Sequence, residues 1–284
     1  MWIKPLCLLV VLILFCIVIS KVISGNQTLA DYADKNPDIA YATICPIETQ
    51  PPSPSAPCPI ETQPPSLTAI TSEPLYAESP ESTHYQYGFY YQALSEELIA
   101  KMVGVSYPTP EENPAISLEE LCYLNVLYYD FNGELQNGSL VCNQKITQDL
   151  VEIFYELYLN EYQIEKIKLI DDYNGDDTAS MLDNNTSCFN YRVVDGTDHL
   201  SKHALGCAID INPFYNPYVV YNIDGTGETY ISPEGSEQYA DRSLNFPYKI
   251  DENDLCYKLF KEHGFVWGGD WNSCKDYQHF QKVV

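Results

Sequence analysis

Histidine and arginine are scarce in this sequence, and several of them lie close together. The 284 residues include five histidines and two arginines, of which Arg192, His199 and His203 fall within one short stretch. Asp210 follows, so an imidazole and a carboxylate lie seven residues apart. Gly206 gives the backbone freedom to turn between them. We therefore expect a strand over Cys207–Ile211 that carries Asp210 inward.

A second group of polar side chains ends the chain, in the segment WGGDWNSCKDYQHF. Asp276 and His279 are three residues apart there. That spacing places them on one face of a helical turn, whereas in an extended segment they would diverge unless the backbone is irregular.

Two histidines and one carboxylate form a three-ligand zinc site with an open fourth position, the arrangement that catalytic zinc uses to hold a water molecule. His203, Asp210 and His279 are the candidate ligands. Asp276 would be the general base that takes a proton from the activated water. Arg192 would stabilise an oxyanion or bind a substrate carboxylate. Spacing alone leaves a surface histidine and a strand-end aspartate as the alternative.

The motifs resemble those of a known enzyme family. SKHALGCAID resembles the SxHxxGxAxD signature of the zinc D-alanyl-D-alanine carboxypeptidases and L-alanyl-D-glutamate endopeptidases of bacterial cell walls. DYQHF resembles their closing carboxylate-x-x-His element, and FNYR the position of their arginine. WGGDW followed by DxxHF is most similar to the endopeptidase branch. The resemblance covers roughly residues 121 to 280.

This resemblance implies zinc as the cofactor and peptidoglycan stem peptides as substrates. It implies a zinc endopeptidase that cuts between L-Ala and D-Glu, with a D-Ala-D-Ala carboxypeptidase or a non-catalytic wall-peptide-binding module as alternatives. It also implies roles for six residues: His203, Asp210 and His279 as zinc ligands, Asp276 as base, Arg192 as electrophilic or substrate-orienting group, and Ser201 as a hydrogen-bond partner of the ligand shell or of the substrate. Trp271 would line the substrate cleft.

Two of these roles have structural alternatives. The Ser201 hydroxyl could instead cap its own backbone, and Trp271, like Trp267, could pack in the core. Cys207 lies between two candidate ligands, but its parity in the strand opposes that of Asp210, so we expect a small buried side chain there.

Charge and the N-terminal region bear on partners and location. Fifteen Lys and Arg against forty Asp and Glu give a net charge of −25, which argues against nucleic-acid binding. Residues 1–24 contain an apolar run, Leu6–Ile19, typical of either a cleaved signal peptide or a membrane anchor. Both alternatives predict an exported protein, either anchored in the membrane facing outward or secreted to the cell wall. Export would permit disulfides, whose pairing the sequence leaves open.

Residues 25–84 are rich in proline and contain the segment CPIETQPPS twice, which predicts an extended linker. Residues 85–284 are expected to form the peptidase domain. Helices are predicted to start at Ser95 and Ser117 and to cover Gln148–Leu159 and Asp251–His263. Strands are predicted at Tyr123–Phe131 and Ile164–Ile170, with turns at Asn132-Gly133 and Asn137-Gly138. This mixture favours an α+β class, and the resemblance implies a hedgehog/DD-peptidase-like domain with a small antiparallel sheet flanked by helices.

Overall fold

The computed structural model describes residues 70–284, except 113, 195–197, 222–224 and 226. The predicted leader and most of the predicted linker lie outside the described residues. The last part of the segment predicted as linker contacts the folded domain. Thr71 donates its backbone N–H to the carbonyl of Leu135, and the Tyr76 side chain is buried. In the described part of the chain, no helix is long and apolar enough to cross a membrane.

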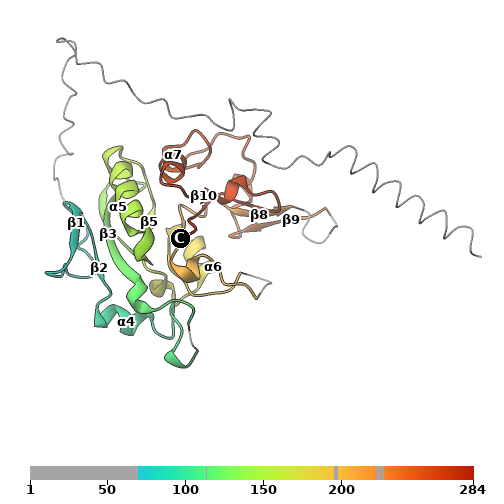
Figure 1. The fold of residues 1–284 in the computed structure, drawn as a ribbon. Coiled ribbons are helices and arrows are strands. Elements are labelled where there is room, and N and C mark those ends of the chain that lie inside the picture. Colours follow the sequence, from blue (N-terminus) through green and yellow to red (C-terminus); the bar gives the residue numbers. More distant parts are fainter. Residues whose placement is uncertain (1–69, 113, 195–197, 222–224, 226) are drawn as a thin grey trace, which may run out of the picture. The chain divides into compact units, whose positions relative to one another are not determined.

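A four-stranded antiparallel sheet forms the first half of the domain (Figure 1). Its strands, in spatial order, are β1 (Thr83–Gln86), β2 (Phe89–Ala93), β3 (Leu121–Tyr129) and β4 (Leu135–Asn143). Nearly every residue of β3 is buried, because this central strand is covered on both faces. Helix α4 (Glu96–Met102) follows β2 and begins after Ser95, whose hydroxyl caps it as expected.

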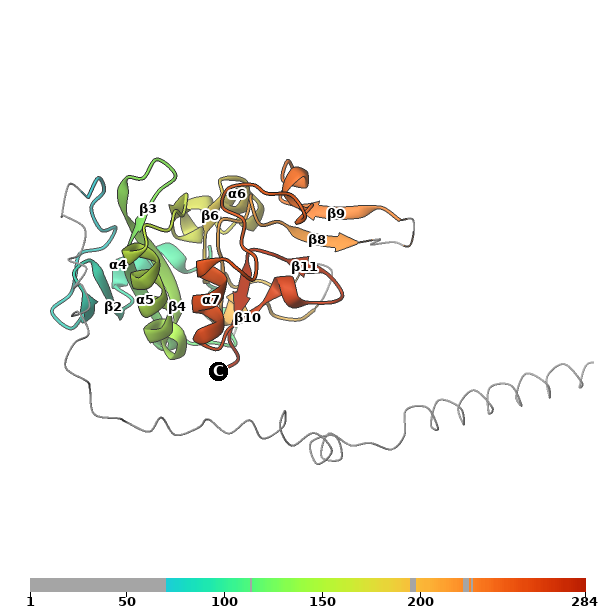
Figure 2. The same cartoon turned by 90° about the horizontal axis from the view of Figure 1, so that it is seen from above.

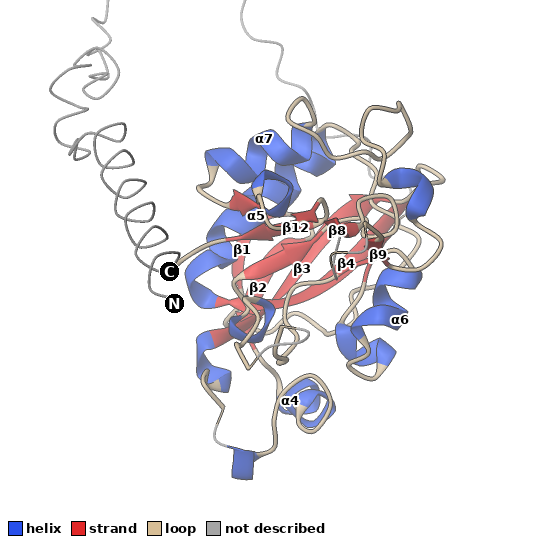
Figure 3. Ribbon diagram, turned by 90° about the vertical axis from the view of Figure 1, so that its right-hand side faces the viewer, coloured by secondary structure: helices blue, strands red, loops and turns tan. Residues whose placement is uncertain are grey.

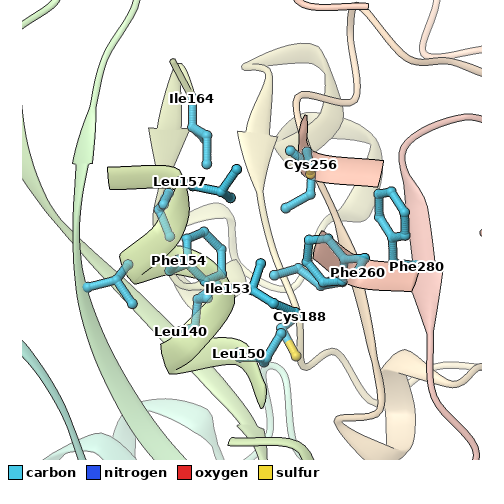
Figure 4. Packing of buried hydrophobic residues seen from close by; sticks show 14 of the residues in the cluster. Leu140, Leu150, Ile153, Phe154, Leu157, Ile164, Cys188, Cys256, Phe260 and Phe280 are labelled. Atoms are coloured by element: carbon cyan, nitrogen blue, oxygen red, sulfur yellow. The ribbon is translucent and has the colours of Figure 1, made fainter. Parts of the chain in front are cut away.

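Helix α5 (Gln144–Leu159) packs against this sheet and carries the main core. It begins four residues before the predicted start, because the Asn143 side chain caps it by accepting the N–H of Lys145. The expected apolar stripe is buried. Figure 4 shows Phe154 and Ile153 of α5 on the side that faces Phe260, with Phe280 stacked beyond it, both from the C-terminal part of the chain. The core thus joins the two halves of the domain.

The second half consists of small sheets and short helices (Figures 2 and 3). One sheet has the order β10 (Val266–Trp267), β12 (His279–Gln281), β7 (Ala208–Asp210). Another has the order β11 (Lys275–Asp276), β8 (Tyr218–Tyr221), β9 (Thr229–Ser232). Strands β5 (Lys166–Ile167) and β6 (Asn185–Thr186) pair in parallel. Among the described residues, the remaining α-helices are α6 (Asp177–Leu182) and α7 (Leu255–Glu262).

The predicted turn at Asn137-Gly138 is wrong, because both residues lie inside β4. There the Gly138 Cα packs against Ile167: a Cβ on Gly138 would lie 2.8 Å from the Cβ of Ile167. The glycine therefore permits a close approach between strands. The other predicted turn, at Asn132-Gly133, does connect β3 to β4.

Three other predicted elements are shorter than expected. Only Lys166–Ile167 of the predicted strand Ile164–Ile170 has a strand partner. Helix α7 starts after Asp254, which caps it, and so lacks the first residues of the predicted Asp251–His263. The helix predicted at Ser117 is a single 3-10 turn, Leu118–Glu120, closed by the expected capping box. The mixture of helices with small, mostly antiparallel sheets agrees with an α+β class.

Candidate metal centre

Three buried side chains from distant parts of the chain meet at one point. His203 Nε2 lies 3.2 Å from Asp210 Oδ2, and His279 Nδ1 lies 2.9 Å from Asp210 Oδ1. The two imidazole nitrogens are 3.1 Å apart. In the part of the chain that the structure describes, this is the one group of His, Cys, Asp and Glu found close enough together to hold a metal ion. The structure therefore brings together the three predicted ligands.

Strand pairing places two of the three donors. His279 in β12 lies directly opposite Asp210 in β7, and directly opposed residues of antiparallel strands have their side chains on the same face. His203 begins a 3-10 turn, His203–Leu205, that ends at Gly206 with a left-handed φ of 62°. A Cβ on Gly206 would lie 2.7 Å from the backbone nitrogen of Asn143, so this tight turn requires glycine.

Each imidazole is held by a hydrogen bond at its outer nitrogen. His203 Nδ1 lies 2.6 Å from the carbonyl oxygen of Cys188, and His279 Nε2 lies 3.1 Å from Oε1 of Gln281. Oxygen acceptors on the outside stabilise the tautomer in which the two outer nitrogens carry the proton. In that tautomer the two inner nitrogens and the carboxylate of Asp210 converge as donors for a cation.

The electrostatics of the cluster also favour positive charge beside Asp210. Burial opposes the charged forms of both Asp210 and His279, but the charges and hydrogen bonds within the cluster outweigh this effect. The charge of His203 and the hydrogen bonds of the two histidines hold the pKa of Asp210 well below its usual range. Asp210 in turn raises the pKa of His279 to about 9. A donor set of two imidazoles and one carboxylate fits zinc, because catalytic zinc sites use these ligand types.

Asp276, the predicted base, lies beside this cluster without joining it. Its Oδ1 atom is buried and has no hydrogen-bond partner. Burial, together with the charge of Asp210, raises the pKa of Asp276 to about 7, although His279 acts in the opposite direction. A Cβ on Gly268 would lie 2.6 Å from both the Cβ and the carbonyl oxygen of Asp276, so the glycine of the WGGDW segment lets the backbone carrying Asp276 pass closely.

The structure places the remaining predicted site residues in different settings. The ring of Trp271 lies 5.3 Å from that of His279, beside the cluster, whereas Trp267 is a core residue. Ser201 is buried and its hydroxyl accepts the N–H of His203, which is the capping alternative. Arg192 pairs with Asp177 at 2.7 Å, and its Nε is buried without a hydrogen-bond partner.

Other side chains that could bind a metal have partners of their own. Cys207 is buried, as predicted, and its thiol donates to the carbonyl of Leu205. His84 pairs with Glu78, and His263 at the end of α7 pairs with Asp149. The six cysteines that the structure describes are all free thiols.

Sequence reasoning missed the partners of the two histidines. Gln281 follows His279 by two residues in a strand, so period-two alternation puts both side chains on one face and was a usable signal. The carbonyl of Cys188 has no counterpart signal in the sequence, since any residue type supplies a carbonyl.

The geometry thus defines a buried His-Asp-His centre with a carboxylate beside it, an arrangement typical of metal-dependent hydrolases. Residues 195–282 match a family model described as D-alanyl-D-alanine carboxypeptidase. This segment contains all three donors and Asp276, so the match confirms the resemblance to the D-alanyl-D-alanine carboxypeptidase family. It does not specify the endopeptidase branch. Neither the curated proteins nor the solved structures yield a match to this chain.

Proposed function

We propose that this protein is a zinc metallopeptidase that hydrolyses a stem-peptide bond of peptidoglycan. The observation that carries this proposal is the orientation of the two imidazoles. Hydrogen bonds to Cys188 and Gln281 hold the outer nitrogens of His203 and His279 and direct their inner nitrogens at Asp210. A buried pair of imidazoles with only a structural role would not need both inner nitrogens to converge on one carboxylate.

His203, Asp210 and His279 would hold the zinc ion. When bound, zinc makes a water molecule nucleophilic at neutral pH and polarises the scissile carbonyl. The other steps fall to the residues of the chain. Asp276 Oδ1, free of hydrogen bonds, accepts a proton as water attacks the carbonyl carbon. It returns that proton to the departing amine nitrogen as the C–N bond breaks.

Two further groups would act on the substrate. Trp271, which lies against the ring of His279, would form part of the cleft wall. Arg192 would bind a substrate carboxylate or stabilise the oxyanion, in exchange for its ion pair with Asp177. Ser201 supports the turn that carries His203, and we assign it that positioning role in preference to a substrate contact.

The bond that is cut has two candidates. The closing segment WGGDW with DYQHF favours cleavage between L-Ala and D-Glu. The description of the matched family, D-alanyl-D-alanine carboxypeptidase, favours removal of the terminal D-Ala. A wall-peptide-binding module without catalysis is disfavoured, because it would not need a second buried carboxylate, with an oxygen free of hydrogen bonds, beside the predicted ligands.

Mass spectrometry of muropeptide digests tests both activity and bond. The full chain with zinc should release new amino termini or free D-Ala from purified muropeptides. Asp276→Asn should lose turnover while keeping its zinc and its fold. Asp270→Asn is the matched control, because Asp270 is an exposed aspartate that pairs with Lys261. If the wild-type protein cuts no muropeptide, or if Asp276→Asn cuts at the wild-type rate, the proposed function is wrong.

We also propose that the protein is exported, either anchored through its N-terminal apolar segment or secreted to the wall, where peptidoglycan would be accessible. Fractionation of cells that express the full chain tests this. Recovery of the intact chain in the cytoplasm alone would contradict it.

A further inference from the structure

One face of the sheet β11-β8-β9 continues outward from Asp276. In the strand register, Asp276 lies opposite Tyr218, Tyr218 opposite Ser232, and Val220 opposite Tyr230. Opposed residues of antiparallel strands share a face, and alternate residues of one strand do as well. Asp276, Tyr218, Val220, Ser232 and Tyr230 therefore lie on one face of this sheet.

The opposite face of the same sheet belongs partly to the core. Val219 is fully buried, and Ile231, its cross-strand neighbour, packs against the main core cluster. By contrast, Tyr218 is half-buried and Tyr230 is 46% exposed. The two tyrosine rings meet edge to face, with centroids 6.3 Å apart. Aromatic side chains thus remain accessible on the face that Asp276 shares.

The hairpin β8–β9 extends away from the body of the domain (Figure 2). Neighbouring strands are about 4.8 Å apart, so β9 lies about 10 Å from β11, which carries Asp276. On β9 the residue in line with Asp276 is Ser232, and Tyr230 lies two residues, about 7 Å, further along, so Tyr230 is about 12 Å from Asp276. An extended peptide rises about 3.3 Å per residue, so a chain that runs from Asp276 to Tyr230 would need about three to four residues. Stem peptides have room for such an extension, whereas a dipeptide does not.

We propose that this tyrosine face, formed by Tyr218 and Tyr230 beside Asp276, is a substrate-binding surface for the part of a stem peptide that extends about three to four residues from the scissile bond. The inference rests on the proposed function and deepens it. The accessible ring faces supply apolar contact with little conformational entropy to lose. The protein would accordingly select extended stem peptides over short fragments that contain the same bond.

Tyr230→Ala tests the proposal, with Tyr221→Ala as the matched control. Tyr221 is also an exposed tyrosine of the hairpin, at 54%, but it follows Val220 and so lies on the opposite face. Steady-state kinetics should compare the full stem peptide with a truncated peptide that ends one residue beyond the scissile bond on each side. For Tyr230→Ala we expect KM for the full peptide to rise about three- to tenfold with kcat unchanged. Neither constant should change for the truncated peptide, and Tyr221→Ala should resemble wild type.

Binding measured without turnover separates this surface from the activity. Calorimetry of the full stem peptide with the Asp276→Asn protein should show a Kd that Tyr230→Ala weakens by the same three- to tenfold. The inference would be overturned if Tyr230→Ala left Kd and KM for the full peptide unchanged. It would also be overturned if Tyr221→Ala had an equal effect, or if Tyr230→Ala weakened binding of the truncated peptide as much as that of the full peptide. If wild type cuts nothing but Tyr230→Ala still weakens peptide binding, the proposed activity fails and the surface stands. If the protein neither cuts nor binds the peptide, both fail.

Discussion

Gly268 offers a way to move the proposed base without changing its chemistry. An alanine Cβ at this position would lie 2.6 Å from the Cβ and from the carbonyl oxygen of Asp276. Ordinary van der Waals contact begins near 3.4 Å, so Asp276 or the turn that carries Gly268 must move by about 0.8 Å. The φ of Gly268 is not in the left-handed region, so the substitution acts through this contact.

The size of the effect follows from that displacement. A shift of about 1 Å in a catalytic group lowers turnover by about a hundredfold, so Gly268→Ala should lower kcat about 10- to 100-fold. The corresponding loss of transition-state stabilisation is about 1.4–2.7 kcal/mol. Overpacking should also cost about 1–3 kcal/mol of unfolding free energy. The zinc content should stay at the wild-type level, because no predicted ligand is touched.

Gly269→Ala is the matched control. Its Cβ would lie 2.4 Å from the ring of Trp267, so it should cost similar stability while Asp276 stays in place. The assay combines muropeptide turnover, metal analysis and urea unfolding on both variants. Full turnover in Gly268→Ala, or an equal loss of kcat in Gly269→Ala, would refute the link between Gly268 and the position of Asp276.

Three other outcomes are expected. Zinc at about a thousand times its Kd should stabilise the fold by about 4 kcal/mol. In calorimetry, EDTA should therefore lower the Tm of wild type but not that of His279→Ala. Equal Tm shifts in the two proteins would exclude His279 as a ligand. Burial raises the pKa of Asp254 to about 6. The contribution of the Asp254 carboxyl to stability is therefore fully present below about pH 4 and is lost as the pH rises through 6. Asp254→Asn keeps an oxygen acceptor for the Tyr162 hydroxyl. In urea unfolding it should be about 2–3 kcal/mol more stable than wild type at pH 8 and equally stable near pH 4. A stability difference that does not change with pH would contradict the raised pKa. Phe260→Ala should cost about 3–5 kcal/mol of unfolding free energy, because its buried ring stacks on Phe280, and a loss below 1 kcal/mol would contradict the core described here.

Patterns in the sequence predicted those elements that depend on interactions between residues close together in the chain. The apolar stripe of α5 follows the helical period, so its core face was predictable, and Ser95 caps its helix through its own hydroxyl. The start of α5 was misplaced because the capping residue, Asn143, also ends a strand, and apolar periodicity does not report a cap. Asn137-Gly138 has the composition of a turn, but its surroundings override that preference: contact with Ile167 requires a residue without a side chain inside β4.

The amino-acid sequence by itself determined which side chains could form the centre, because histidines and aspartates can bind zinc and because the motifs that hold them resemble those of a known family. Tertiary structure decided that they meet. His279 faces Asp210 across 69 residues of sequence because β12 lies between β10 and β7 in one register, and no local spacing encodes that pairing. The same pairing decided that Asp276 and His279, three residues apart, belong to different sheets. Register depends on the burial of many side chains at once, so it emerges only when the whole domain is folded.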